Sequence, residues 1–289
     1  MEFSLGKRWL FVVLITISVV GNILVYTYVF TPPSGGVLTI SFLNVGQGDA
    51  ILIQGPTGVR VLVDGGPDRS VLRELSNKLP PWTRHIDALV ETHPDKDHIA
   101  GLGDVLERYQ VSHFLESGVP DTTAVSKHVK ELVEKEQGLT HVVVKRGMRI
   151  HLGGGAYADV LYPERDQSYQ TVTNDGSIVL HVVYGSTSVM LTGDLSSEFE
   201  DQLVVRDGSA LSSTVLKAGH HGSKYSTDQE WLSYVNPEYV VISAGRSNPY
   251  GHPSEEVLAR VAAQGAEVLS TIESGTLTFV SDGRSMRVR

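Results

Sequence analysis

The sequence predicts an α/β fold in which two β-sheets pack face to face, helices cover both outer faces, and one membrane-spanning helix precedes the domain. The first half of the chain is rich in short apolar runs separated by tight turns, and in the second half such runs alternate with helix-like segments. The 289 residues, of which 41% are hydrophobic, are enough to bury a sizeable core. Polar, metal-ligand residue types recur directly after the apolar runs.

The N-terminal segment 9–30 carries no formal charge and is long enough to span a bilayer as a helix. Lys7 and Arg8 precede it, so the positive-inside rule places the N-terminus in the cytoplasm and the domain outside. The run does not end in small residues, which favours an uncleaved anchor over a signal peptide. We therefore expect a single-pass protein of the cell membrane with a stub and anchor at 1–30, a linker at 31–36 and an extracytoplasmic domain at 37–289.

The composition excludes several classes of site and partner. The chain has no cysteine, which excludes disulfides, thiolate metal sites and a cysteine nucleophile. Its net charge of -9 argues against a general nucleic-acid coat protein, which carries a basic surface. A local basic patch around a cleft remains open.

Three short strands are expected at 38–43, 49–54 and 59–63, and the turn sequences between them predict an antiparallel meander. The meander ends in the sequence DGG, which begins with Asp64. This carboxylate either holds a ligand histidine by a hydrogen bond or caps a helix at 70–79. The residues alone leave both alternatives open.

The segment 91–102, ETHPDKDHIAGL, follows an apolar strand and leads into a helix at 99–109. Open α/β sheets place their ligand sites in such loops. Alternate side chains of an extended loop point the same way, so His93 and Asp95 can close on one ion. Asp97 and His98 come after the turn into the helix and face a second ion. The alternative is that Asp95 and Asp97 cap the helix while the histidines lie on the surface.

The remaining elements are predicted from the same periodicities. Strands are expected at 86–90, 111–116, 141–145, 148–152, 158–162, 177–184, 188–192, 214–217 and 239–243, and near Val268, Leu277 and Met286. Helices are expected at 122–137, 196–205, 228–234 and 254–264. Three consecutive glycines at 153–155 are interpreted as a turn because no helix follows them.

Asp194 ends a third motif, an apolar strand followed by Gly193. A carboxylate has two oxygens and can bridge two cations, which makes Asp194 a candidate shared ligand. The alternative is that it caps the helix that begins near Ser196.

The segment 217–223, KAGHHGS, repeats the order of strand, glycine and imidazoles. Adjacent histidines between glycines are unlike core residues, and one can bind metal while the other donates to an oxyanion. His252 lies at a further helix start and is either a site residue or a simple loop residue. The other six histidines are assigned no role: His85, His113, His128, His141, His151 and His181.

These motifs, in this order, resemble those of the metallo-β-lactamase superfamily. The resemblance is strongest to its ComEC branch of competence proteins, and it covers essentially everything after Gly36. It is carried by FLNVGQGDA (42–50), LVDGG (62–66), THPDKDH (92–98), LTGD (191–194) and KAGHHGS (217–223). The resemblance implies an αββα sandwich with a two-metal hydrolytic site at one edge.

The working hypothesis for this site is metal-assisted hydrolysis of a phosphoester. One ion is held by His93 and Asp95, the other by Asp97, His98 and His221, and Asp194 bridges them. His220 and Lys217 face the phosphate, and His252 is a further ligand or a proton donor. Asp97, His220, Lys217 and His252 are thus the expected catalytic residues.

Two departures from the superfamily pattern affect the expected cofactor, two divalent ions of manganese or zinc. A histidine is usual where this chain has Asp95, and a further ligand histidine is replaced by the sequence NDGS at 174–177. The first site is therefore richer in oxygen ligands, which shifts its preference from zinc toward manganese or magnesium.

The resemblance makes extracellular DNA the leading substrate, which implies a membrane-anchored phosphodiesterase or nuclease of DNA uptake. A separate DNA-channel protein is a further expected partner, because only one spanning segment precedes the domain. A second interpretation keeps the site and changes the substrate to a small or cell-wall phosphoester, and a third is a tethered binding domain without turnover.

Overall fold

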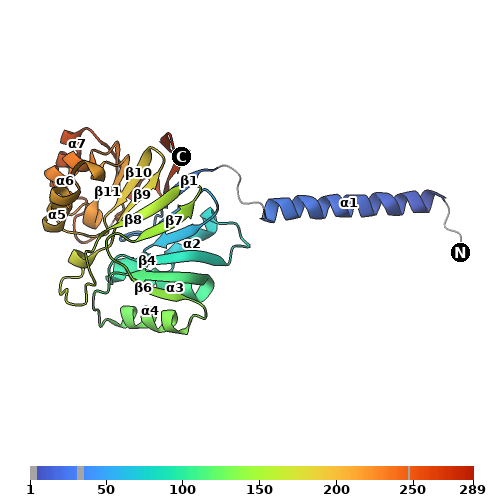
Figure 1. The fold of residues 1–289 in the computed structure, drawn as a ribbon, viewed down its shortest axis with the longest axis horizontal. Helices are drawn as coiled ribbons and strands as arrows, with labels where there is room; N and C mark the ends of the chain where they lie inside the picture. Colours follow the sequence, from blue (N-terminus) through green and yellow to red (C-terminus); the bar gives the residue numbers. More distant parts are fainter. Residues whose placement is uncertain (1–4, 31–35, 247) are drawn as a thin grey trace.

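The computed structural model describes residues 5–30, 36–246 and 248–289, with side chains in the first helix described at 9, 10 and 12–22. After that helix, two sheets pack together between two layers of helices (Figure 1). This arrangement confirms the predicted α/β sandwich. Each strand and helix expected after residue 37 has a counterpart in the structure.

Within the described residues, sheet A has eight strands and sheet B has seven. In spatial order, sheet A runs β15 (Met286–Val288), β14 (Leu277–Ser281), β1 (Leu38–Phe42), β2 (Ile51–Gln54), β3 (Arg60–Val63), β4 (His85–Glu91), β5 (Gln110–Glu116), β6 (Thr140–Val143). Sheet B runs β13 (Glu267–Ser270), β12 (Tyr239–Ile242), β11 (Val215–Lys217), β10 (Thr187–Leu191), β9 (Val179–Tyr184), β8 (Ala156–Tyr162), β7 (Arg149–Gly153). The α-helices are α1 (Leu5–Phe30), α2 (Ser70–Lys78), α3 (Lys96–Arg108), α4 (Ala124–Lys135), α5 (Ser197–Asp207), α6 (Gln229–Val235), α7 (Glu255–Gln264) and α8 (Thr271–Ser274).

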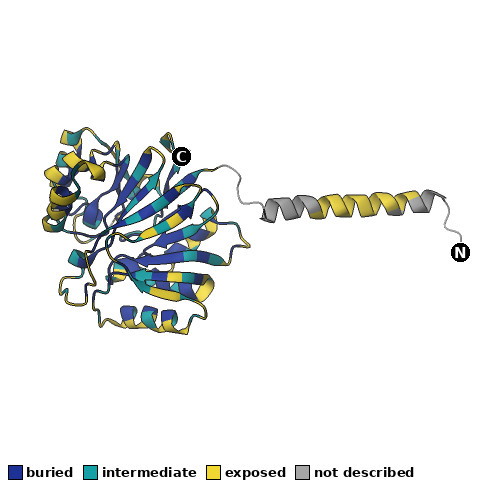
Figure 2. Cartoon of the chain, viewed as in Figure 1, coloured by how far each residue is buried: buried dark blue, intermediate teal, exposed yellow. Residues whose placement is uncertain are grey.

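Alternating side chains of the strands build three hydrophobic layers. Val61 and Val63 of β3 point into the core between the sheets, while Leu62 points outward against α2 and α3. In sheet B, Val189 points into the same central core and Met190 packs under α5 and α6. Figure 2 shows the resulting buried interior of both sheets. Strands buried on both faces explain why their sequences are continuous apolar runs.

The polar loops gather because neighbouring strands run parallel. Strands β3 to β6 are parallel in sheet A, and β10 to β13 are parallel in sheet B. The predicted antiparallel meander of β1, β2 and β3 is also present. Parallel neighbours end at the same edge of a sheet, so the loops that follow β3, β4, β10, β11 and β12 lie together there.

The loop between β1 and β2 packs directly on the start of α3. Gly48 has φ +127°, and a Cβ added to it would lie 2.0 Å from the carbonyl oxygen of Asp97. The backbone N–H of Asp49 donates to that same carbonyl, over 3.3 Å. Only glycine permits this approach, so the turn fixes the position of the Asp97 backbone.

Helix α1 covers the segment predicted as an anchor. Its described apolar side chains are exposed, from 47% at Val13 and Ile15 to 69% at Trp9. Among the described residues, no helix is both long enough and apolar enough to cross a membrane. Several side chains of 9–30 lie outside the described ones, and the anchor stays a prediction.

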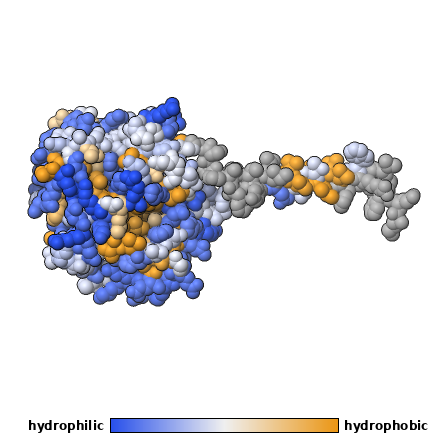
Figure 3. All heavy atoms as spheres, in the orientation of Figure 1, coloured by the Kyte–Doolittle hydropathy of each residue, from blue (hydrophilic) through white to orange (hydrophobic). Residues whose placement is uncertain are grey.

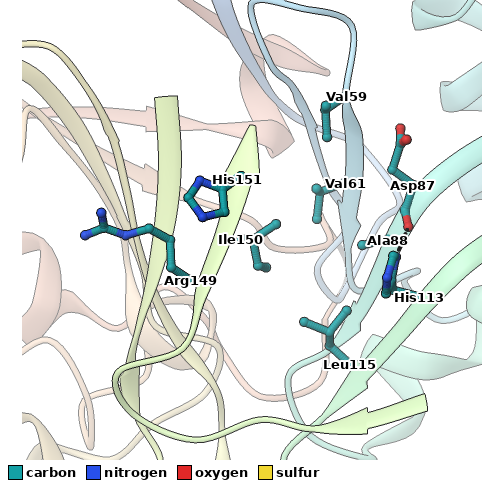
Figure 4. A pocket seen from close by; sticks show the side chains of 9 residues that line it. All are labelled: Val59, Val61, Asp87, Ala88, His113, Leu115, Arg149, Ile150 and His151. Atoms are coloured by element: carbon teal, nitrogen blue, oxygen red, sulfur yellow. Dashed lines mark hydrogen bonds between the residues drawn. The ribbon is translucent and has the colours of Figure 1, made fainter. Parts of the chain in front are cut away.

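A cavity of about 360 Å³ opens between β3 to β5 of sheet A and the edge strand β7 of sheet B (Figure 4). Its floor is apolar, with Val61, Ala88 and Leu115 on one side and Ile150 on the other, and His113 and His151 stand at its rim. Figure 3, drawn in the orientation of Figure 1, shows a group of apolar residues in the middle of the visible face of the domain. None of the predicted site residues lines this cavity.

Candidate metal centre

One carboxylate oxygen lies at the centre of the predicted site. Oδ2 of Asp194, which follows β10, is 3.3 Å from Nε2 of His98, 3.4 Å from Nε2 of His221, 3.7 Å from Nε2 of His220 and 4.0 Å from Nε2 of His93. Four imidazoles from two chain segments, one after β4 and one after β11, therefore face a single oxygen.

The two remaining carboxylates stand at either side of this centre. Oδ2 of Asp97 lies 3.3 Å from Nε2 of His221, and Oδ2 of Asp95 lies 3.7 Å from Nε2 of His93. Neither carboxylate plays the alternative role of a helix cap: Asp95 is at the N-cap of α3 without a side-chain capping bond, and Asp97 already belongs to the first turn. Asp194 likewise precedes the N-cap of α5, which is Ser196.

The cluster has the donor atoms that a cation needs. The Nε2 atoms of His93, His98 and His221 are buried and have no hydrogen-bond partner among the described residues. Ligand atoms of two overlapping triads lie within 4.8 Å of one another, one with His93, His98 and Asp194 and one with Asp97, His98 and His221. Buried polar atoms that converge without partners are costly unless an ion joins them, so this donor set fits divalent metal.

Hydrogen bonds behind the rings set the tautomers of the ligand histidines. Nδ1 of His98 donates to Oδ2 of Asp64 over 2.9 Å, and Nδ1 of His221 donates to the Ser243 carbonyl over 2.9 Å. A proton on Nδ1 leaves the lone pair of Nε2 free for a metal ion. Asp64 thus orients His98, a candidate ligand, and does not cap α2, whose N-cap is Arg69.

His93 is oriented in the same way through Thr92. The Thr92 hydroxyl donates to Oδ2 of Asp64 over 2.7 Å, so its oxygen is left to accept from Nδ1 of His93, 3.0 Å away. The Ser177 hydroxyl lies 3.3 Å from the same Nδ1 and accepts the backbone N–H of Asp194 over 3.1 Å. The sequence NDGS therefore lies beside the cluster, where it supplies hydroxyl and amide groups in place of an imidazole.

The adjacent histidines 220 and 221 have opposite hydrogen-bond roles. The Asn174 side chain donates to Nδ1 of His220 over 3.4 Å, which leaves the ring proton on Nε2. His220 thus presents a donor, and its side chain is 32% exposed against 1% for His221. Both residues have left-handed backbones, with φ of 47° and 56°, and this turn lets consecutive side chains reach one site.

A family model described as the metallo-beta-lactamase superfamily matches residues 43–246, which is more than two thirds of the chain. This chain belongs to the metallo-β-lactamase superfamily. The fold and the donor set are those of a metal-dependent hydrolase.

Within the superfamily, the chain is similar to proteins of bacterial competence. It is 30% identical over 259 residues to ComE operon protein 3 of Bacillus subtilis, with 83% of this chain and 32% of that protein covered. It is 30% identical over 241 residues to competence protein ComA of Neisseria gonorrhoeae, again with 83% and 32% covered. The chain therefore spans about a third of the length of these relatives.

Solved structures share the fold at low sequence identity. The metallo hydrolase Igni18 of Ignicoccus hospitalis aligns with a TM-score of 0.55 and 18% identity over 83% of this chain and 98% of that one. The diiron β-hydroxylase CmlA of Streptomyces venezuelae aligns with a TM-score of 0.53 and 16% identity over 83% of this chain and 53% of that one.

Lys217 lies beneath the cluster, and the prediction that it faces a phosphate is wrong. Its side chain is fully buried, and its Nζ is 2.5 Å from Oδ2 of Asp49 and 3.7 Å from Oδ1 of Asp194. Nζ also donates to the carbonyl of Gly193 over 3.2 Å. The ammonium is enclosed on the protein side by these groups, so it positions Asp194 and cannot reach a substrate.

Asp49 is the main site residue that sequence reasoning missed. It belongs to the quoted motif FLNVGQGDA, but its partner Lys217 is remote in sequence and its burial depends on the packing of Gly48. The sequence did place Asp49 between two apolar runs, which indicates that this acid is buried. A buried acid requires a cationic partner, so a search for that partner could have found Lys217.

The electrostatics of the cluster couple the acids to the imidazoles. Burial alone raises the pKa of Asp194, but His221 and His98 outweigh it and hold that pKa well below its usual range. Burial lowers the pKa of His221, and attraction by Asp194 overcomes this and raises it to about 9. His93, by contrast, has its pKa lowered by burial and by the neighbouring His98.

Proposed function

We propose that this chain is a metal-dependent phosphodiesterase that acts on DNA and uses two divalent ions. His93 and Asp95 would hold one ion, and Asp97, His98 and His221 would hold the other. The observation that carries the proposal is the convergence of imidazole Nε2 atoms on Oδ2 of Asp194, each oriented from behind. The similarity to competence proteins supports DNA as the substrate.

In this proposal each protein group has a defined task. Bound divalent ions supply Lewis acidity and a nucleophile derived from water near neutral pH. Asp194 holds both halves of the site together, and Lys217 fixes its other oxygen. His220 is oriented by Asn174 so that its Nε2–H can donate a hydrogen bond to a phosphoryl oxygen.

His252 stands beside His220 as the candidate hydrogen-bond donor to the leaving group. Its ring centroid is 5.4 Å from that of His220, and its Nδ1 is buried without a hydrogen-bond partner among the described residues. Burial and the neighbouring His220 lower its pKa and so favour the neutral ring, which can donate a hydrogen bond to the leaving oxygen through an N–H group.

The central test is hydrolysis by the Asp194→Asn variant. The full chain, purified in detergent and supplied with manganese or zinc, is expected to hydrolyse single-stranded DNA, and Asp194→Asn is expected to lower kcat by at least about 100-fold. Circular dichroism should show an unchanged fold. Asp104→Asn on α3, outside the cluster, is the matched control and should retain activity. Full activity of Asp194→Asn would refute the bridging role.

The metal preference follows from the first site, where Asp95 replaces a histidine. Carboxylate oxygen favours manganese or magnesium over zinc. Metal analysis of protein purified without added metal should therefore find manganese or magnesium, and stoichiometric zinc alone would contradict this part of the proposal.

A small or cell-wall phosphoester is the second candidate substrate, favoured by the net charge of -9. A polyanion that binds through several phosphate contacts loses affinity steeply as salt increases, and a small monoanionic ester does not. The salt dependence of KM separates the two substrates.

We also propose that α1 anchors the protein in the cell membrane with the domain outside. The absence of charge in 9–30 and the exposed apolar side chains of its described part support this topology. Fractionation should recover the full chain with membranes, and external protease should degrade the domain in spheroplasts. A separate channel protein would then be the partner that takes up the DNA.

A further inference from the structure

The loop between β12 and α7 carries His252 beside the metal centre, and the side chain of Asn248 forms four of its hydrogen bonds. Nδ2 of Asn248 donates to the carbonyls of Gly245 and His252, over 2.8 and 2.7 Å. Its Oδ1 accepts the backbone N–H groups of Tyr250 and His252, over 3.2 and 3.0 Å. The amide of one asparagine therefore joins Gly245 to Tyr250 and His252.

A second contact ties this loop to the turn that carries Gly48. Oε1 of Gln47 accepts the backbone N–H of Gly245 over 3.1 Å. The same turn packs against the start of α3, where Asp97 lies. The position of the loop relative to the metal centre is therefore set by two independent hydrogen-bond systems.

The loop extends the row of rings outward from the cluster. The His220 and His252 centroids are 5.4 Å apart, and the Tyr250 ring stacks on His252 with centroids 5.7 Å apart and an interplanar angle of 26°. Tyr250 is nevertheless 68% exposed. One face of the tyrosine is covered by His252, and the opposite face is open to solvent beside the groups assigned to the scissile phosphate.

We infer that Tyr250 is a specificity-determining residue whose open face stacks on an unpaired nucleobase next to the scissile phosphodiester. This inference rests on the proposed phosphodiesterase function. Stacking on an aromatic side chain is tolerant of base identity, because every base has a π-face. A base in a duplex has both faces covered, so the platform selects single-stranded DNA or frayed ends.

The geometry favours a planar base over a quaternary ammonium group such as choline. Recognition of such cations uses a cage of several aromatic faces. Among the described residues of this loop, Tyr250 offers one open face, and the ring behind it is an imidazole whose pKa is lowered. The one open face of the Tyr250 ring therefore suits a planar nucleobase better than a quaternary ammonium group.

The test compares two substrates of equal length and charge, oligothymidylate and the same phosphodiester chain made of abasic units. The metal-loaded full chain should prefer oligothymidylate in kcat/KM by about 5-fold to 150-fold. Tyr250→Ala should remove most of this preference through KM, and Tyr250→Phe should retain it. Tyr234→Ala, which removes a 39% exposed tyrosine of α6, is the control and should leave the preference unchanged.

Binding provides a readout that does not need turnover. Fluorescence anisotropy in the Asp194→Asn background should show tighter binding of oligothymidylate than of the abasic chain, and this difference should vanish when Tyr250→Ala is added. If the wild-type protein cleaves neither chain while this base-dependent binding persists, the proposed nuclease function fails and the stacking role stands.

Three results would overturn the inference. The first is an equal loss of kcat/KM on both chains in Tyr250→Ala, since that indicates a role in folding the loop alone. The second is equal binding of the two chains by the protein with Tyr250 intact. The third is a preference for a phosphocholine ester over oligothymidylate that depends on Tyr250, since that assigns the ring to a cation.

Discussion

At the scale of single residues, the carboxylate of Asp64 sets the orientation of a candidate metal ligand, His98. It accepts from Nδ1 of His98 and also from the backbone and hydroxyl of Thr92, whose oxygen in turn faces His93. One buried acid therefore orients two histidines. Partners of this kind contribute to metal affinity without touching the ion.

Replacing Asp64 should weaken metal binding. Asp64→Asn keeps the shape of the side chain and removes its charge, and we expect the affinity for manganese to fall about 10-fold to 100-fold. Titration against a metal-binding dye measures this effect directly. Asp104→Asn, applied as the control, should bind metal like the wild type. An unchanged affinity in Asp64→Asn would show that packing alone orients His98.

At the scale of elements, the turn between β1 and β2 is fastened to α3 by a glycine. Gly48→Ala would place a Cβ 2.0 Å from a backbone oxygen, and overpacking of this kind costs about 1–3 kcal/mol. Gly46→Ala is the matched control, because Gly46 also has a positive φ, of +84°, but no atom within 4 Å of the added Cβ. Urea unfolding should show a larger loss of stability for Gly48→Ala. Equal losses would mean that backbone strain alone accounts for both.

Helix α5 carries a buried acid that makes stability depend on pH. Burial raises the pKa of Glu200 to about 8. The folded state then keeps a proton that the unfolded chain releases, so the free energy of unfolding falls as pH rises from about 4.5 to about 8. This group contributes at most about 1.4 kcal/mol per pH unit. Glu200→Gln should flatten the pH profile of urea unfolding, and Glu198→Gln, on the same helix, should not. Parallel profiles for the wild type and Glu200→Gln would contradict the assignment.

Most strands and helices could be predicted from the sequence because the spacing of their apolar residues differs between the two kinds of element. Strands such as β3 and β10 are buried on both faces and appear as continuous apolar runs, and α3 and α7 repeat at helical spacing. The short helix α8 was not predicted, because four residues carry no period. The helix predicted from Ile99 begins at Lys96, since Asp95 is the last extended residue before it.

The site was predictable only in the loops that follow strands. His93, His98, Asp194 and His221 stand there as polar residues next to glycine or apolar runs, and the structure brings them together. The contacts that a side chain makes with the opposite sheet depend on the order of the strands, which the sequence does not reveal. Lys217 was therefore predicted to face outward, although Asp49 from the sheet A side encloses it.

At the scale of the whole molecule, the metal centre joins the two sheets. His93, Asp97 and His98 follow β4 of sheet A, while Asp194 and His221 follow β10 and β11 of sheet B. An ion shared by these groups is a link between the two layers of the sandwich. We therefore expect metal binding to be coupled to the stability of the entire domain.

Addition of manganese should raise the melting temperature of the protein. Metal at about 100 times its Kd contributes about 2.7 kcal/mol to the free energy of unfolding. His221→Ala should abolish most of this gain, whereas His113→Ala, at the rim of the cavity away from the metal centre, should preserve it. Differential scanning calorimetry with and without a chelator measures the shift. A metal-dependent gain that survives in His221→Ala would place the stabilising ion elsewhere.

Lys217 has a consequence for how the protein acquires its ions. Its ammonium neutralises Asp49 and one side of Asp194 from within, so the acids at the base of the centre have a permanent counter-charge. We therefore expect the domain to fold without a cofactor and to accept ions afterwards. The choice between metals would then rest on the donor atoms around Asp95 in the finished site.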